Sequence, residues 1–90
     1  MQWVDEISSE GAYGFQQTVR VGQSRRGFWW GEVSGFRWRG NEGGMTTRRF
    51  RLSAEDAQGV MILMARARAG QMVTVSDVAQ RMTDTLIHEA

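Results

Sequence analysis

Hydrophobic and polar residues alternate along most of the first half of the chain. The alternation runs over residues 15–21, 28–39 and 45–52, and many of its apolar positions hold β-branched or aromatic residues. Because successive side chains of a strand point to opposite faces of a sheet, a period of two predicts three half-buried strands. Residues 1–14 alternate more weakly and predict an N-terminal arm or a short strand.

Two polar segments that contain glycine separate the three predicted strands. Residues 22–27 predict a hairpin loop with Arg25 and Arg26 at its tip, and residues 40–44 predict a second, flexible turn. Connections of this length join antiparallel neighbours, so we expect an antiparallel sheet.

Joining the three strands by their apolar sides predicts one core face and one arginine-rich face. The core face would contain Val19, Val21, Phe28, Trp30, Phe36, Trp38, Phe50 and Leu52. The opposite face would carry Arg20, Arg37, Arg39, Arg49 and Arg51, with Trp29 beside them. Gly31 and Gly35 indicate either a bulge or a point at which another backbone or a ligand comes close. A bulge would exchange the faces of half of the middle strand, so which tryptophan faces outward stays open.

A helix is predicted directly after the third strand, over residues 54–69. Ser53 is a good N-cap, Glu55 and Asp56 add acidic side chains to the first turn, and Gly70 stands at the C′ position. Start and stop signals of this kind define the two ends of the helix from local sequence alone.

The body of this helix is apolar on nearly every side, because residues 60–64 form a run of five apolar side chains. One side can pack on the sheet, and we expect the rest to be covered by a symmetry mate or by the last helix. Gly59 costs about 1 kcal/mol relative to Ala and suits a place where another backbone comes close. Met61 and Met64 fit a core better than a peptide-binding groove.

The last twenty residues predict a short strand followed by a second helix. The strand would cover residues 71–75, and the helix would begin at Ser76 as its N-cap, with Val78, Met82 and Leu86 at four-residue spacing.

The expected fold is therefore α+β. It has a curved antiparallel sheet of three to four strands, an apolar helix packed on it, and a short C-terminal helix. Residues 1–14, 15–70 and 71–90 would be the arm, the sheet-plus-helix unit and a C-terminal helical extension of a single domain.

The net charge of +1 conceals a strongly basic middle segment. Residues 20–51 hold eight arginines against Glu32 and Glu42, a net charge of +6, whereas residues 1–19 carry −3 and residues 52–90 carry −2. A local basic field attracts polyanions. Every basic residue is Arg, which also fits the codon usage of a GC-rich genome.

Composition excludes several classes of function. The chain has no Cys, no Lys and one His, so we find no thiolate metal site and no nucleophile–base pair, and we expect no enzyme activity, cofactor or metal. No apolar run approaches the roughly 20 residues that span a bilayer, and the expected location is the cytoplasm.

Residues 15–69 carry a recognisable order of features. A strand ends in the basic loop at Arg25 and Arg26, and a long aromatic strand carries Trp38 before the turn at residues 40–44. A basic strand then runs straight into Leu-Ser-x-Glu at residues 52–55 and an apolar helix.

This order resembles the whirly-like single-stranded-DNA-binding domain of positive cofactor four and its small bacterial and phage relatives. The resemblance implies a non-enzymatic dimer that binds single strands on curved sheets. Two departures stand against it: the Pro and Lys-Gly of the family are replaced by Arg49-Phe50, and residues 71–90 have no counterpart.

The leading functional hypothesis is nucleic-acid binding. Arginine pairs with phosphate and aromatic rings stack on bases. Single strands are favoured because the first helix is too apolar to lie in a duplex groove. The candidate binding residues are Arg20, Arg25, Arg26, Trp29, Arg37, Trp38, Arg39, Arg49 and Arg51. The expected oligomer is a homodimer, or a higher homo-oligomer, formed through the apolar helix 54–69.

Other interpretations stay open. In one, the tryptophans are core residues and the arginines only solvate an exposed sheet face. In another, the basic face binds an acidic protein partner. A small phage or mobile-element effector that binds and inhibits a host protein fits a lone domain without catalytic residues. A purely structural subunit of a closed oligomer is a third class.

Overall fold

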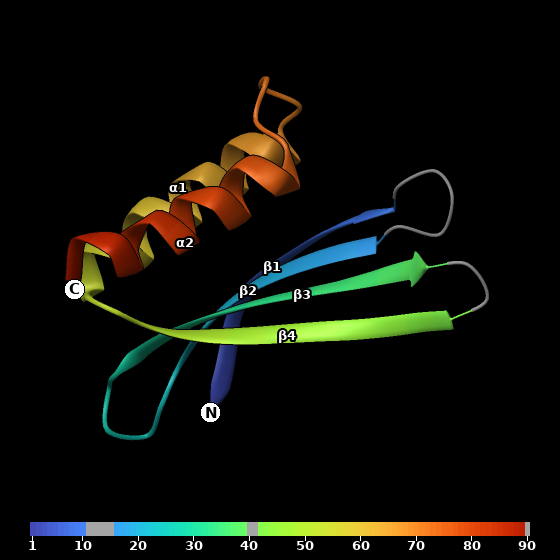
Figure 1. Ribbon diagram of the computed structural model, residues 1–90. Coiled ribbons are helices and arrows are strands. Elements are labelled where there is room, and N and C mark those ends of the chain that lie inside the picture. The colour runs from blue at the N-terminus through green and yellow to red at the C-terminus, as the bar shows by residue number, and fades with distance from the viewer. Residues whose placement is uncertain (11–15, 40–41, 90) are drawn as a thin grey trace.

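The computed structural model contains one four-stranded antiparallel sheet and two helices (Figure 1). The structure describes residues 1–10, 16–39 and 42–89, and for residues 10, 36–39, 42–43 and 85–89 it describes the backbone alone. The strands follow one another in chain order across the sheet: β1 (Gln2–Glu10), β2 (Gln16–Gln23), β3 (Trp29–Arg39) and β4 (Glu42–Leu52). The expected α+β fold with a curved antiparallel sheet is confirmed.

Both helices, α1 (Ala54–Arg68) and α2 (Val75–Glu89), lie side by side on the same face of the sheet (Figure 1). The opposite face of the sheet carries no helix in the described part of the chain. This asymmetry divides the molecule into a core side and an open side.

The N-terminal segment is a full member of the sheet. β1 pairs with β2 from Gln2 to Glu10, with a register shift between Trp3 and Asp5. Because of this shift, Trp3 lies on the open side with the even-numbered residues of β2, while Ile7 enters the core. The weak alternation of residues 1–14 reflects this irregularity, since a bulge interrupts the period of two.

The hydrophobic core lies between the two helices and the face of the sheet that they cover. Its buried side chains are Ile7, Val19, Val21, Phe50, Leu52, Ala57, Val60, Met64, Val78, Ala79 and Met82. They confirm four of the core positions predicted for the strands, Val19, Val21, Phe50 and Leu52. The predicted core positions Phe36 and Trp38 lie outside the side chains that the structure describes.

The faces of β3 are the reverse of those predicted. Trp29 packs against the core, whereas Trp30 lies on the open side and Phe28 is 44% exposed. The reason is Gly31, where a Cβ atom would lie 2.4 Å from the sulfur of Met82. Without a side chain, Gly31 lets α2 approach the sheet, so Trp29, Gly31 and Val33 of β3 face the helices. The prediction placed them outward because it matched strands by apolar side chains, and glycine has none.

Local signals fix both ends of α1 as predicted. Ser53 is the N-cap, and its Oγ accepts a hydrogen bond from the Asp56 backbone N–H at 3.0 Å. At the other end Gly70 adopts a φ of 74° and donates to the Ala67 carbonyl, while Gln71 donates to the Arg66 carbonyl. These two bonds form a Schellman motif, which requires the left-handed conformation that glycine readily adopts.

The start of α2 differs from the prediction by two residues. Thr74, not Ser76, precedes the helix: its hydroxyl accepts from the Asp77 N–H at 3.1 Å, and the Asp77 carboxylate accepts from the Thr74 N–H at 2.9 Å. Residues 71–74 form bends and coil instead of the predicted strand. The Thr-x-x-Asp spacing was the sequence signal for this reciprocal capping box.

The structure shows which elements cover α1 within the described part of the chain. The helix is covered by the sheet and by α2, as one of the two alternatives proposed. Gly59, however, adjoins no close backbone, because a Cβ atom there would meet nothing within 4 Å. Among the described residues, nothing therefore packs closely over Gly59.

Alanine substitutions at two glycines should act in opposite directions on stability. Gly31→Ala should lower the free energy of unfolding by about 1–3 kcal/mol, because the buried Met82 thioether must repack. Gly59→Ala should raise the free energy of unfolding of the monomer by up to about 1 kcal/mol, since the position is open and helical within the single chain. Urea unfolding measures both. The loss at Gly31 should shrink in a Met82→Ala background, and an equal loss in both backgrounds would contradict the contact.

The capping box predicts a pH-dependent contribution to stability. Hydrogen bonds from the backbone and side chain of Thr74 hold the pKa of the Asp77 carboxyl below its ordinary value. A lowered pKa in the folded state means that the stabilisation is complete above the unfolded pKa of about 3.9 and is lost as the pH falls through the folded value. Asp77→Ala should therefore lower the melting temperature at neutral pH, and the difference from the wild type should close in strong acid.

Candidate nucleic-acid interface

The side of the sheet without helices forms a surface that we call the arginine face. Strand alternation and register bring to it the side chains of Trp3, Glu6, Arg20, Trp30, Glu32, Arg49 and Arg51. Arg48, next to Arg49 in β4, points to the other side of the sheet, where its guanidinium lies 5.6 Å from the ring of Phe50. The predicted placement of Arg20, Arg49 and Arg51 on one face is therefore confirmed.

Glu32 is the electrostatic centre of this face. Its side chain is buried, with the residue only 7% exposed although no helix covers it. Arg49 Nε donates a hydrogen bond to Glu32 Oε2 at 2.9 Å, and Arg20 Nη1 lies 4.0 Å from Oε1. The two arginines from the neighbouring strands therefore enclose the carboxylate and compensate its charge.

A second acid completes the compensation. Arg20 Nε lies 2.8 Å from Glu6 Oε2, yet this nitrogen makes no hydrogen bond, so the contact is an ion pair with poor directionality. The ring of Trp3 lies 5.4 Å from the guanidinium of Arg20 and 5.8 Å from that of Arg49. We call Trp3, Glu6, Arg20, Glu32 and Arg49 the paired cluster. Its two acids balance its two arginines.

Arg51 has a different environment. Its guanidinium lies 3.8 Å from the centre of the Phe28 ring and 5.6 Å from the centre of the Trp30 ring. Among the described residues it forms no ion pair. We call Phe28, Trp30 and Arg51 the stacking cluster. It combines an uncompensated positive charge with two aromatic rings on the arginine face.

The turn between β2 and β3 holds Phe28 beside this charge. The Ser24 backbone N–H donates to the Phe28 carbonyl at 2.9 Å, and the Ser24 hydroxyl accepts from the Phe28 N–H at 3.1 Å. Gly27 has a φ of 86°, a left-handed conformation that favours glycine. The turn presents Arg25 and Arg26 as exposed side chains at the same end of the sheet as the stacking cluster.

The structure distributes the predicted site residues over three environments. Arg20 and Arg49 belong to the paired cluster, and Arg25, Arg26 and Arg51 remain without acidic partners among the described residues. Trp29 lies on the core side. The side chains of Arg37, Trp38 and Arg39 lie outside those that the structure describes.

Sequence reasoning missed Trp3, Phe28, Trp30 and Glu32 as members of this face. The sequence places Glu32 two residues after Trp30, which puts both on the same face of a strand. Its arginine partners could be recognised only from the strand register, which pairs Glu32 with Arg20 on one side and with Arg49 on the other.

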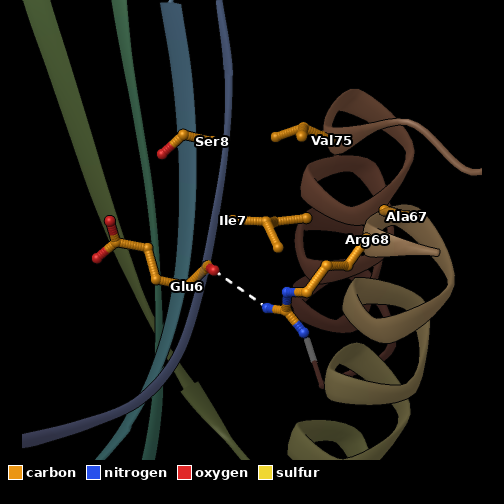
Figure 2. Close-up of a pocket in the computed structure, with 6 residues that line it drawn as sticks. All are labelled: Glu6, Ile7, Ser8, Ala67, Arg68 and Val75. Carbon is orange, nitrogen blue, oxygen red and sulfur yellow. Dashed lines mark hydrogen bonds between the residues drawn. The ribbon is translucent and has the colours of Figure 1, made fainter. Parts of the chain in front are cut away.

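A cavity of about 280 Å³ lies on the other side of the sheet, between β1 and the two helices (Figure 2). Ile7, Ala67 and Val75 line it, while the side chains of Glu6 and Ser8 point away. Arg68 also lines the cavity and donates to Asp5 Oδ1 at 2.6 Å and to the Glu6 carbonyl at 3.2 Å. These bonds attach α1 to β1, so the guanidinium of Arg68 already has partners within the fold.

Two further searches of the described residues give negative results. No group of three or more His, Asp or Glu side chains there is arranged to hold a metal ion. None of the helices in this part of the chain combines the length and apolar character needed to cross a bilayer.

Comparison with protein-family models, with curated proteins and with solved structures finds no match to this chain. The resemblance to the whirly-like family thus stays a prediction, and the properties of the site have to be argued from its own geometry.

The paired cluster predicts that Arg49 contributes to stability and Arg51 does not. Arg49→Ala should lower the free energy of unfolding by about 1–3 kcal/mol, because it removes the hydrogen bond to the buried Glu32 carboxylate. Arg51→Ala removes the same charge from the same face and should change it by less than about 0.5 kcal/mol. Urea unfolding of both variants tests this, and equal losses would contradict the division of the face.

Proposed function

We propose that the protein binds single-stranded nucleic acid on the arginine face, centred on the stacking cluster. Phe28 and Trp30 would stack on bases, and Arg51 with Arg25 and Arg26 of the adjoining turn would contact phosphates. This proposal keeps the function expected from the sequence and moves its centre from Trp29 to the other side of the strand.

The observation that carries the proposal is the contact between Arg51 and Phe28. A guanidinium 3.8 Å from an exposed ring, with no carboxylate among its described neighbours, offers both a cation and a flat apolar surface. The phosphate of a nucleotide can pair with the guanidinium while its base stacks on the ring. Stacking on an aromatic side chain contributes about 1–3 kcal/mol per base.

Single strands fit this surface better than a duplex. Bases can reach Phe28 and Trp30 only when they are unpaired, because stacking needs a free base face. The helices, which would be the natural elements to enter a major groove, lie on the opposite side of the sheet (Figure 1).

The paired cluster limits where single-stranded nucleic acid can bind on the arginine face. Glu6 and Glu32 place two carboxylates beside Arg20 and Arg49, so phosphates gain little net attraction there. The uncompensated arginines lie toward the end of the sheet where β2 turns into β3. We therefore propose that the nucleic acid crosses the sheet at the end where β2 turns into β3.

The experiment is fluorescence anisotropy with labelled single-stranded DNA, single-stranded RNA and duplex DNA at a low and a moderate salt concentration. We expect single strands to bind more tightly than duplex and affinity to fall as salt rises, because phosphate contacts release counterions. Trp30→Ala should weaken binding about 5- to 160-fold, corresponding to the loss of about 1–3 kcal/mol of stacking. Arg51→Ala should weaken it by at least several-fold.

Arg48→Ala is the matched control. It removes the same charge from the same strand, also beside an aromatic ring, but on the core side of the sheet. It should leave affinity nearly unchanged. An equal loss for Arg48→Ala and Arg51→Ala would mean that only net charge matters. No binding of any oligonucleotide at low salt would overturn the proposal and favour a protein partner instead.

A further inference from the structure

The side of α1 that faces away from the core carries a row of residues that takes no part in the packing of the described chain. The helix packs inward through Ala57, Val60 and Met64. At about 100° per residue, the opposite side presents Glu55, Gly59, Ile62 and Arg66, which we call the outer stripe. Ile62 is 50% exposed, the space above Gly59 is open, and both charged residues are exposed.

The order of the outer stripe is self-complementary. Along the helix it reads acid, glycine, large apolar residue, base. Glu55 and Arg66 lie equally far from the midpoint between residues 60 and 61, and so do Gly59 and Ile62. When two such helices lie antiparallel about a two-fold axis at this midpoint, each Glu55 faces an Arg66 and each Ile62 faces a Gly59.

We propose that α1 forms an antiparallel contact with α1 of a second copy of this chain. Ile62 of each copy would fill the open space over Gly59 of the other. Glu55 and Arg66 would form an ion pair at each end of the contact. Such an interface is isologous, with the same residues contributed by both subunits.

The charges favour a second copy over other occupants. Among the described residues, neither Glu55 nor Arg66 forms an ion pair. They are eleven residues apart, about 16 Å along the helix, so they are too distant to pair within one α1. In an antiparallel pair each lies beside its opposite charge, and the helix dipoles are also antiparallel.

The contact explains a glycine that the single chain leaves unexplained. Gly59 lies in the helix, where it costs about 1 kcal/mol relative to Ala, and a Cβ atom there would meet no described residue outside its own helix within 4 Å. A close helix–helix approach gives its missing side chain a purpose. The dimer would also place the two arginine faces on opposite outer sides, because α1 lies on the other side of each sheet (Figure 1).

Sedimentation equilibrium of the full chain, without nucleic acid, tests the proposal. The wild type should be a dimer at micromolar concentration. Glu55→Arg and Arg66→Glu should each raise the dimer dissociation constant at least tenfold, because each creates like-charge contacts at both ends. The double variant Glu55→Arg/Arg66→Glu should restore dimerisation.

A mixture of the two single variants gives the sharpest result. Glu55→Arg carries two bases on the stripe and Arg66→Glu carries two acids, so each should stay monomeric alone and the mixture should form heterodimers. Arg81→Glu, an exposed charge reversal on α2, should leave the mass unchanged. Circular dichroism checks that every variant is folded, and Ile62→Lys provides a second monomeric variant.

Three outcomes would overturn the proposal: a monomeric wild type at high concentration, a dimer that both single variants leave intact, or a mixture that forms no heterodimer. Because the test contains no nucleic acid, any of these results leaves the proposed function of the arginine face untouched.

Discussion

The contact between Met82 and Gly31 is the constraint on which the rest of the structure depends. Met82 is fully buried, and its thioether occupies the space where any other residue at position 31 would carry a Cβ atom. The contact brings α2 onto the centre of the sheet and fixes which face of β3 is inside. Since side chains alternate along a strand, this single choice also places Trp30 and Glu32 on the opposite side of the sheet.

One result of that choice is the division of the arginine face. Turning β3 this way places Glu32 between Arg20 and Arg49 and places Trp30 beside Arg51. Half of the face becomes a compensated ion-pair cluster that contributes to the fold, and the other half keeps a free charge next to aromatic rings. Arginines that look equivalent in the sequence thus have different roles.

The two surfaces on which the proposals rest lie on different layers of the molecule. The arginine face and the outer stripe of α1 lie on opposite sides of the sheet–helix pair, with the core between them (Figure 1). A change on one surface can therefore be tested without altering the other. This separation allows the proposed α1 contact and the proposed nucleic-acid binding to be tested as distinct properties.

The sequence by itself determined the strands β2 and β4, the ends of α1 and the placement of Arg20, Arg49 and Arg51 on one face. Each of these features depends on alternation or on bonds between residues a few positions apart. Ser53 and Gly70, which cap the two ends of α1, are examples of such local bonds. The start of α2 was predicted two residues too late, although Thr74 and Asp77 carried a local signal for it. The orientation of β3 was decided only by tertiary structure. Glycine carries no hydrophobic signal, so the packing of a distant methionine on Gly31 could not be predicted. The same packing placed Trp30, and not Trp29, on the arginine face, and it buried Glu32 between two arginines.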